Sequence, residues 1–460
     1  MVSPRADIST NWPMRLEVHR LSTRNRVLDM DLQDILADHV EALGIPGSVL
    51  GVLHEDARTV ACAGSANLES ASLVGPDTSF QIASVTKPMN ALVACRLAAR
   101  GLLDFTAPLD TAIPELAHSE WASHVRIEQL LTNDGGIPMT RGTEFLYKAE
   151  SDDALARLAA ELAEASPTFA SGTSWSYSNA AACLLGRLIE VLTGETYERA
   201  LRSELFEPLG MTTTGFIHDR PPPNMATGYE VGETKGPAAV SELWRSRGLG
   251  PAGTTVWSTA GDLLRLAGPL VSTRTDYLDD YWTTWLRETT VELRIPPFMD
   301  AWCRSLAVFR WEGGPVWAWF GICTGFRAFW LLIPTQRTAI TLLVNSVNGA
   351  QLFRALLPDL MEDIGVRVPP MHSDSQTRTE EVLRRYCGHY GWPDAKSDLT
   401  LDGDALRVSG AQNSSLLPID AHLFRRSDGD PDIPFMSFAN FDASGQPHVL
   451  YNAVWAIPRI

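Results

Sequence analysis

The stretch that most constrains this chain runs from Gln81 to Gly101. It carries Ser84 and Lys87 near its start and continues as an apolar run up to the glycine. Residues three apart lie on one face of a helix. Pro88 suits the first turn, where a missing N–H costs little, and Gly101 is a typical helix stop. The pattern predicts a helix that presents a hydroxyl beside an amine near its N-terminus.

A hydroxyl beside an amine can act as a nucleophile with its own base. Burial lowers the pKa of an amine, and the N–H groups at a helix N-terminus stabilise a developing oxyanion. The spacing alone is weak evidence, since serine and lysine often meet at it by chance. However, the chain has only four lysines, and only Lys87 has a serine three residues before it. The competing interpretation is a surface helix with a solvated lysine.

Length and charge limit the classes of protein to consider. A chain of 460 residues is too long for one ordinary domain, which predicts one large and one small domain. The net charge of −17 argues against nucleic acid and anionic membranes as partners. The N-terminus lacks the apolar core of a secretory signal, and no later run is long and uncharged enough to span a bilayer. We therefore expect a cytoplasmic protein without membrane or nucleic-acid partners.

The six cysteines are scattered through apolar runs, without close pairs or the spacing of metal ligands. This usage is typical of buried free thiols rather than disulfides. No cofactor and no metal are expected from it.

The chain up to about residue 365 shows alternating helical and strand patterns, typical of a mixed α/β (α+β) fold with an antiparallel sheet flanked by helices and a helical subdomain. Strands after a helical middle indicate that this sheet is assembled from both ends of the domain. Ser258 is a plausible cap for a helix that follows it. The expected helices are 31–43, 152–163 and 180–193. The expected strands are 48–54, 57–64, 306–311, 316–320, 328–333 and 338–345.

A proline pair and a polar stretch near residue 369 predict a boundary, which gives an N-terminal extension at 1–28, a catalytic domain at 29–365 and a C-terminal β-domain at 366–460. The last part alternates short strands with turns, as in a small β-barrel. The expected strands there are 386–390, 399–408, 416–424 and 435–455, with turns inside the longer segments.

A second motif, Tyr177-Ser178-Asn179, precedes a predicted helix, so that its tyrosine and asparagine can point into a common cleft. Together with Ser84 and Lys87, it resembles the Ser-x-x-Lys and Tyr-x-Asn motifs of the serine β-lactamase and penicillin-binding-protein-like family. The similar branch contains class C β-lactamases, D-aminopeptidases, and esterases, transesterases and acyltransferases of the same fold. The resemblance covers residues from about 30 to 365.

The third motif departs from this family, which has Lys-Thr-Gly or His-x-Gly on a strand at the site. Here Trp319-Phe320-Gly321 stands at that place, as in some esterases and acyltransferases of the fold. A cation there would pair with a substrate carboxylate, so its absence disfavours β-lactam hydrolysis and carboxypeptidase action. Two questions stay open: Trp319 could be a packed strand residue, and Arg327 could replace the cation or form an ordinary ion pair.

The resemblance implies a role for each site residue. Ser84 would attack a carbonyl carbon, and the coupled Lys87 and Tyr177 would take its proton, with the identity of the base left open. The oxyanion would lie between the N–H groups of Ser84 and Ile322. Asn179 would orient Lys87 or a substrate amide, and Trp319 and Gly321 would line the site.

We therefore expect a serine hydrolase or acyltransferase that acts on esters, thioesters or amides through an acyl-enzyme. Its partner would be a small-molecule acyl substrate, free or bound to coenzyme A or a carrier. The alternatives are a D-aminopeptidase or β-lactamase, and a non-catalytic binding protein of the same fold. The C-terminal segment from Tyr386 to Tyr390 resembles a β-domain appended to several family members. That domain would either stabilise the protein or cap the cleft and dock a carrier-bound acyl group.

Overall fold

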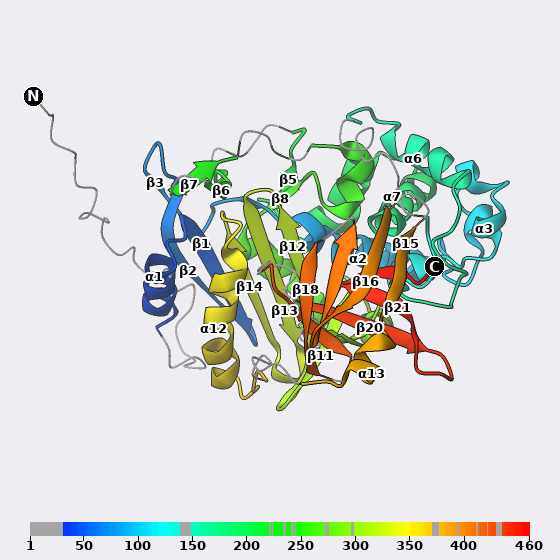
Figure 1. The fold of residues 1–460 in the computed structure, drawn as a ribbon. Helices are drawn as coiled ribbons and strands as arrows, with labels where there is room; N and C mark the ends of the chain where they lie inside the picture. The colour runs from blue at the N-terminus through cyan, green and yellow to red at the C-terminus, as the bar shows by residue number, and fades with distance from the viewer. Residues whose placement is uncertain are drawn as a thin grey trace, which may run out of the picture.

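The structure is a computed structural model of the chain (Figure 1). It describes residues 31–138, 149–219, 222, 224–232, 236–240, 243, 245–271, 276–295, 299–369, 377–392, 395–410, 413–420, 422–428 and 435–460. The predicted N-terminal extension, residues 1–28, lies outside these ranges.

A nine-stranded antiparallel sheet forms the centre of the larger part of the molecule. Its order is β3 (Ser72–Leu73), β2 (Ala57–Asn67), β1 (Gly47–His54), β14 (Thr338–Val344), β13 (Phe326–Ile333), β12 (Gly314–Cys323), β11 (Ala307–Trp311), β10 (Met299–Trp302) and β9 (Val291–Ile295). Strand β1, from the start of the domain, pairs with β14, from its end, in the register Ser48↔Val344. The prediction of an antiparallel sheet assembled from both ends of the domain is therefore confirmed.

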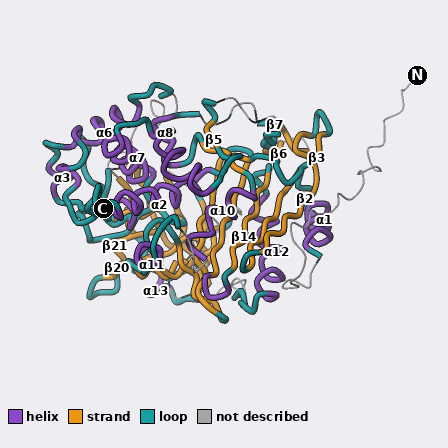
Figure 2. The backbone as a smooth tube through the Cα atoms, turned by 180° about the vertical axis from the view of Figure 1, so that it is seen from behind, coloured by secondary structure: helices purple, strands orange, loops and turns teal. Residues whose placement is uncertain are grey.

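Helices cover both faces of this sheet. One face carries α1 (Leu32–Ala42) and α12 (Gly349–Asp363), and the other carries α2 (Thr86–Ala99) and α10 (Ala260–Val271) (Figures 1 and 2). Helix α1 buries a stripe of residues four apart, as its periodicity predicted, whereas α2 is buried on all sides over most of its length. Most of the central helix is therefore shielded from water.

The remaining helices pack beside α2 or beside helices that contact it, and two small sheets lie next to the central sheet. The helices are α3 (Glu120–Ser123), α4 (Gln129–Thr132), α6 (Ala154–Ala163), α7 (Asn179–Thr193), α8 (Tyr197–Leu201), α9 (Glu207–Leu209) and α11 (Asp280–Arg287). The small sheets are β4 (Phe80–Gln81), β8 (Val256–Ser258) and β5 (Gly215–Phe216), and β6 (Tyr229–Gly232) with β7 (Gly236–Ala239). Strand β4 leads directly into the serine-bearing turn.

The cap predicted for α10 is wrong by one residue. The hydroxyl of Thr259 accepts the N–H of Asp262, whereas the hydroxyl of Ser258 lies 2.8 Å from that of Thr214. The side chain of Ser258 belongs to strand β8, which explains why it faces a neighbouring segment instead of the helix.

The C-terminal part is an eight-stranded antiparallel meander preceded by α13 (Glu380–Arg384). Its strands are β15 (Gly388–Trp392), β16 (Ala395–Asp402), β17 (Ala405–Gly410), β18 (Ser414–Asp420), β19 (Leu423–Arg426), β20 (Phe435–Phe441), β21 (Pro447–Asn452) and β22 (Trp455–Pro458). A bridge between Tyr390 and Arg459 joins its first strand to the last residues, so the sheet is nearly closed. The predicted barrel-like domain is confirmed, although segment 416–424 forms two strands instead of one.

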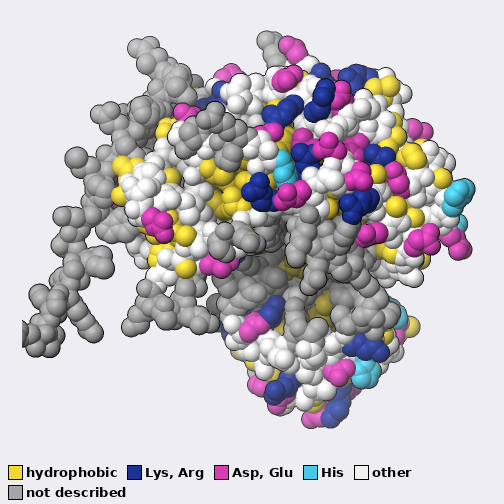
Figure 3. Space-filling view, turned by 90° about the horizontal axis from the view of Figure 1, so that it is seen from above, with side chains coloured by type: hydrophobic (Ala, Val, Ile, Leu, Met, Phe, Trp, Pro, Cys, Tyr) yellow, Lys and Arg dark blue, Asp and Glu magenta, His cyan; other side chains and the backbone are white. Residues whose placement is uncertain are grey.

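Surface and thiol chemistry follow the expected pattern. Acidic and basic side chains are interspersed on the described part of the face seen from above (Figure 3). All six cysteines are free and five are buried, as predicted. Within the described residues, every helix is too short or too polar to cross a bilayer.

Candidate active site

The serine lies in a tight turn between β4 and α2. The turn is the 3₁₀ helix η1 (Ala83–Val85), and Ser84 in its middle is partly exposed. Ala83 adopts a left-handed φ of 44°, a strained conformation for a residue with a side chain. Gly253 packs against this turn so closely that a Cβ atom there would approach the Ala83 carbonyl oxygen to 2.1 Å. Tight packing therefore holds the serine hydroxyl in one position.

Lys87, the second residue of α2, points at this hydroxyl. Its Nζ lies 3.0 Å from the Ser84 Oγ and donates to the carbonyl oxygen of Ala252 at 2.7 Å. Burial lowers the pKa of Lys87 to about 7, because charged ammonium is poorly solvated away from water. The lysine is therefore not the solvated surface residue of the competing interpretation.

The carbonyl that holds Lys87 belongs to a fixed turn. Asn90, one turn further along α2, donates to the carbonyl oxygen of Pro251 at 2.8 Å. The hydroxyl of Tyr197 in turn donates to the Asn90 side chain at 2.6 Å. This chain of buried hydrogen bonds keeps Ala252 in place beneath the lysine.

Tyr177 reaches the same serine hydroxyl from another segment of the chain. Its hydroxyl donates to the Ser84 Oγ at 2.9 Å, and its ring centre lies 4.8 Å from the Lys87 Nζ. Burial raises the pKa of Tyr177 well above its usual range, although the hydrogen bond to Ser84 opposes this effect. The tyrosine is therefore protonated at neutral pH, while the lysine is partly neutral.

The backbone around Tyr177 is clamped from both sides. On one side Asn133, in a left-handed conformation that asparagine tolerates, accepts the N–H of Ser176 through its carbonyl at 2.9 Å and that of Ser178 through its side chain at 3.2 Å. On the other side the N–H of Tyr177 donates to the carbonyl oxygen of Val454 at 3.0 Å. Val454 lies in the turn between β21 and β22, so the C-terminal sheet takes part in positioning the tyrosine.

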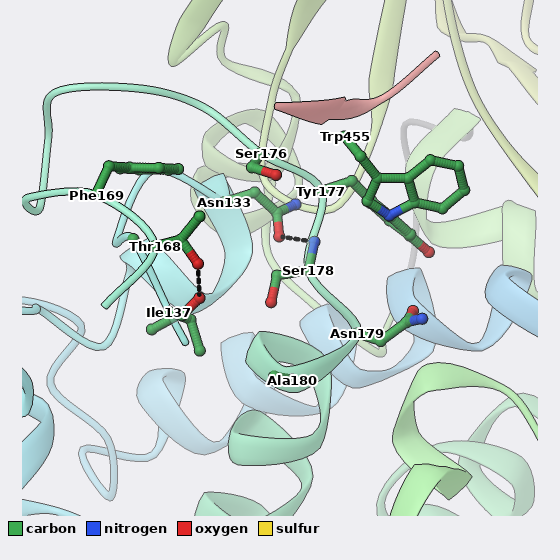
Figure 4. Close-up of a pocket in the computed structure, with 11 residues that line it drawn as sticks. Asn133, Ile137, Thr168, Phe169, Ser176, Tyr177, Ser178, Asn179, Ala180 and Trp455 are labelled. Atoms are coloured by element: carbon green, nitrogen blue, oxygen red, sulfur yellow. Dashed lines mark hydrogen bonds between the residues drawn. The ribbon is translucent and has the colours of Figure 1, made fainter. Parts of the chain in front are cut away.

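Further contacts join the C-terminal sheet to this segment. The hydroxyl of Tyr451 donates to the carbonyl of Trp175 at 3.0 Å, and the N–H of Ala456 donates to the Ser176 hydroxyl at 3.2 Å. The ring of Trp455 lies beside Tyr177, with centroids 6.2 Å apart (Figure 4). The domain boundary predicted near 365 stays a prediction, but the two sheets share one packed core at this place.

Strand β12 forms the third wall. It continues past its last pairing with β11 at Ala318, so residues 319–323 have an edge that faces η1. A Cβ atom at Gly321 would approach the carbonyl oxygen of Ile82 to 2.0 Å, which explains why only glycine fits there. Trp319 is 5% exposed, and its ring centroid lies 5.0 Å from that of Tyr177. Trp319 and Gly321 thus lie beside the serine and tyrosine, on the α2 side of the sheet.

Ile322 and Arg327 are paired across β12 and β13, and their side chains lie on the other face. The Arg327 guanidinium donates at 2.8 Å to the carbonyl oxygens of Cys323 and Phe326, and its Cβ packs on Gly349 of α12. This placement points the arginine away from Ser84. The Ile322 side chain is 47% exposed. Only the backbone N–H of Ile322 is a candidate for an oxyanion site.

Asn179 is the first residue of α7 and is exposed. Within the described part of the chain, the hydrogen bonds of Lys87 go to Ser84 and Ala252, and none joins it to Asn179. Asn179 instead lines a cavity of about 150 Å³ beside the Tyr177 segment (Figure 4). The described residues that line it are all uncharged: Asn133, Gly136, Ile137, Thr168, Phe169, Ser176, Tyr177, Ser178, Asn179, Ala180 and Trp455.

Two other tryptophans, on strands β12 and β13, have structural contacts. The indole N–H of Trp330 donates to the Leu263 carbonyl under α10, and that of Trp317 donates to the Arg287 carbonyl, each at 3.0 Å. Sequence reasoning missed the parts played by Ala252, Asn133 and the β21–β22 turn. A backbone carbonyl leaves no signal in a sequence, whereas Asn133 directly precedes Asp134-Gly135-Gly136, a loop signal at which asparagine tolerates a left-handed conformation.

The site thus brings together a serine hydroxyl, a buried lysine three residues later and a tyrosine from another segment, which is the arrangement of a Ser-x-x-Lys motif. The chain belongs to the beta-lactamase family, whose family model, described as "Beta-lactamase", matches residues 32–361. It is thus an enzyme of that family, with a serine-hydrolase-type fold, and the expected resemblance is confirmed.

Individual relatives differ in their named activities. The chain is 28% identical over 338 residues to "Penicillin-binding protein 4" of Amycolatopsis lactamdurans, covering 71% of this chain and 87% of the relative. It is 32% identical over 238 residues to "Esterase EstB" of Burkholderia gladioli, covering 44% of this chain and 59% of the esterase. The solved structure of SurE superimposes with a TM-score of 0.78 at 24% identity, covering 93% of this chain and 98% of SurE. That likeness includes the C-terminal sheet and concerns the fold alone.

Proposed function

We propose that the protein is a hydrolase or acyltransferase that forms an acyl-enzyme on Ser84. One observation carries this proposal: the Ser84 Oγ lies 3.0 Å from the Lys87 Nζ and 2.9 Å from the Tyr177 hydroxyl. A serine held between a base and a proton donor has what nucleophilic catalysis requires.

Lys87 is the proposed base. Its pKa of about 7 leaves a substantial neutral fraction at neutral pH, whereas the raised pKa of Tyr177 keeps the phenol protonated. As the Ser84 oxygen bonds to the substrate carbonyl carbon, its proton passes to the Lys87 Nζ. Tyr177 then donates its proton to the departing oxygen, nitrogen or sulfur and regains one from Lys87.

The oxyanion would form between the N–H groups of Ser84 and Ile322. Ser84 lies at the start of the η1–α2 helical segment, and the edge of β12 that contains Ile322 faces η1. In the second step, water or an acceptor hydroxyl attacks the acyl carbon, and the same two groups carry its proton in reverse. Asn179 lies at the cavity beside Tyr177, which suits contact with substrate more than with Lys87.

The proposed substrates are uncharged esters and thioesters, followed by amides. Trp319 occupies the place of a carboxylate-binding cation, Arg327 points to the other face, and the described residues that line the cavity are uncharged. The 32% identity to an esterase also supports this class. The acyl group would arrive as a small molecule or bound to coenzyme A or a carrier, in the cytoplasm.

Intact-mass analysis after incubation with a p-nitrophenyl acyl ester tests the proposal. We expect one acyl group per chain, located on Ser84, with turnover that Ser84→Ala abolishes. Ser203→Ala, which removes an exposed hydroxyl far along the chain, should react like the wild type. An unmodified wild-type protein, or an adduct that persists in Ser84→Ala, would reject the proposal.

Two further substrates separate the alternatives. Nitrocefin should be turned over far more slowly than uncharged esters, since Trp319 stands where a cation would bind its carboxylate. D-alanyl amides should also react more slowly, since an amide is less reactive than an ester. Fast nitrocefin hydrolysis that depends on Ser84 would identify a β-lactamase instead. A protein that reacts with none of these compounds, nor with a fluorophosphonate, would be a binding protein of the fold.

A further inference from the structure

Among the described residues, the indole N–H of Trp319 is a buried donor that has no acceptor at normal hydrogen-bond geometry. The side chain is 5% exposed. An unpaired donor away from water is unfavourable for stability and rare in folded proteins. A donor retained in this state at an active site is therefore a candidate for a partner that appears during the reaction.

The surroundings of Trp319 identify that partner. Its ring lies 5.0 Å from the Tyr177 ring, centre to centre, and its N–H is near enough to the phenol oxygen to lower the pKa of Tyr177, against the larger effect of burial. Two other buried tryptophans, Trp175 and Trp257, also have unpaired N–H groups, but neither has a ring contact with Tyr177 among the described residues.

The neighbouring Trp302 differs from Trp319 in that its indole N–H has an acceptor. Its ring lies 4.7 Å from that of Trp319 and 6.4 Å from that of Tyr177, so it belongs to the same aromatic cluster. However, its N–H donates to the carbonyl of Leu131 at 2.9 Å. Ring packing alone thus does not require the Trp319 N–H to be unpaired.

We infer that Trp319 is a positioning residue whose N–H stabilises the oxygen of Tyr177 when the phenol has given its proton to the leaving group. The inference rests on the proposed function. In this step the O–H bond of Tyr177 breaks and a bond from that proton to the leaving oxygen forms, while the serine proton stays on Lys87. The tyrosine oxygen is then negative, and a hydrogen bond to a charged acceptor is stronger than one to a neutral hydroxyl. Transfer of the proton from Lys87 to Tyr177 restores the resting state.

This role makes a specific prediction about leaving groups. An alkyl ester needs a proton on its departing alkoxide, whereas p-nitrophenolate departs with little help. In Trp319→Phe we expect kcat for alkyl esters to fall about tenfold or more, with a clearly smaller loss for p-nitrophenyl esters of the same acid and little change in KM. Thermal stability should fall less than in Trp302→Phe, since both variants lose ring volume but only Trp302→Phe breaks a hydrogen bond.

Trp302→Phe is the matched control, because it removes a paired N–H from the same cluster. It should lower thermal stability and affect both ester classes equally. Trp319→His, which keeps a ring N–H, should recover part of the alkyl-ester activity. Equal losses for both ester classes in Trp319→Phe, unchanged turnover, or a Trp319→Phe protein that unfolds would each overturn the inference. Absence of an acyl adduct on Ser84 in the wild type would instead reject the proposed function, independently of Trp319.

Discussion

The acid side of the pH–rate profile gives a direct test of Lys87 as the base. Burial moves the pKa of this amine from 10.5 to about 7, which disfavours its charged form by about 5 kcal/mol relative to water. Only the neutral amine accepts a proton, so the active fraction follows deprotonation. For a pKa of about 7, that fraction is about 1% at pH 5 and about 90% at pH 8.

We therefore expect kcat/KM for a neutral ester to rise about 90-fold from pH 5 to pH 8, with a midpoint near 7 and a slope of one in logarithmic form. No other group in the site should produce this rise. The pKa of Tyr177 is well above its usual range, and burial raises the pKa of the nearby Cys183 to about 12. The assay should measure the released alcohol by chromatography, so that ionisation of a chromophore does not enter.

Unfolding is a separate cause of lost activity, and linkage gives its sign. The folded-state pKa of Lys87 is below its unfolded value, so this lysine destabilises the fold as pH falls from about 10 to about 7, and no further below that. A denaturation midpoint measured at pH 5 and pH 7 therefore serves as the control. A flat profile from pH 5 to 8, or a midpoint near 10, would refute the assignment of Lys87 as base.

Two further substitutions test the walls of the site. Gly321→Ala would push β12 away from the Ile82 carbonyl, and we expect a loss of about 1–3 kcal/mol in stability together with most of the activity. The control Gly268→Ala places a methyl group in open space on α10 and should leave stability and activity intact. An active, stable Gly321→Ala enzyme would contradict the close packing. Trp455→Ala removes a half-buried ring from the cavity wall and enlarges the cavity. We expect about 1–2 kcal/mol of destabilisation and a broader range of accepted esters. Tyr281→Ala, at an exposed aromatic, should change neither, and an unaltered ester preference in Trp455→Ala would show that the C-terminal sheet does not line the binding site.

The sequence predicted those elements whose own periodicity and end signals are strong. Helix α7 ends at Gly194 with a left-handed φ, and β12 and β13 are joined by a turn at Gly325 with φ of 77°, both readable from the residues. Helix α12 was not expected; Pro358 interrupts its interior, and prolines usually disfavour helices. Strands β9 and β10 were also missed, although Val291–Ile295 alternates apolar and charged residues as a half-buried strand does.

The site was predictable as far as side-chain chemistry could show it. Ser84, Lys87 and Tyr177 were identified from motif spacing, and the structure brings them together, while their catalytic roles stay proposals. The fate of Arg327 depended on which face of β13 it occupies, and that is set by pairing with β12 across a hairpin. The contact of Val454 with Tyr177 joins residues 277 positions apart, and no local pattern encodes such a distance.

The hydrogen bond from the Tyr177 N–H to the Val454 carbonyl has a consequence for the dynamics of catalysis. Hairpin turns near the end of a sheet open more readily than a central strand, as local fluctuations well below global unfolding. Each such opening would release one side of the backbone that carries the tyrosine. The population of molecules able to turn over is then the population in which the β21–β22 hairpin is closed, so mutations or ligands on the outer surface of the C-terminal sheet could tune the rate without touching the cleft.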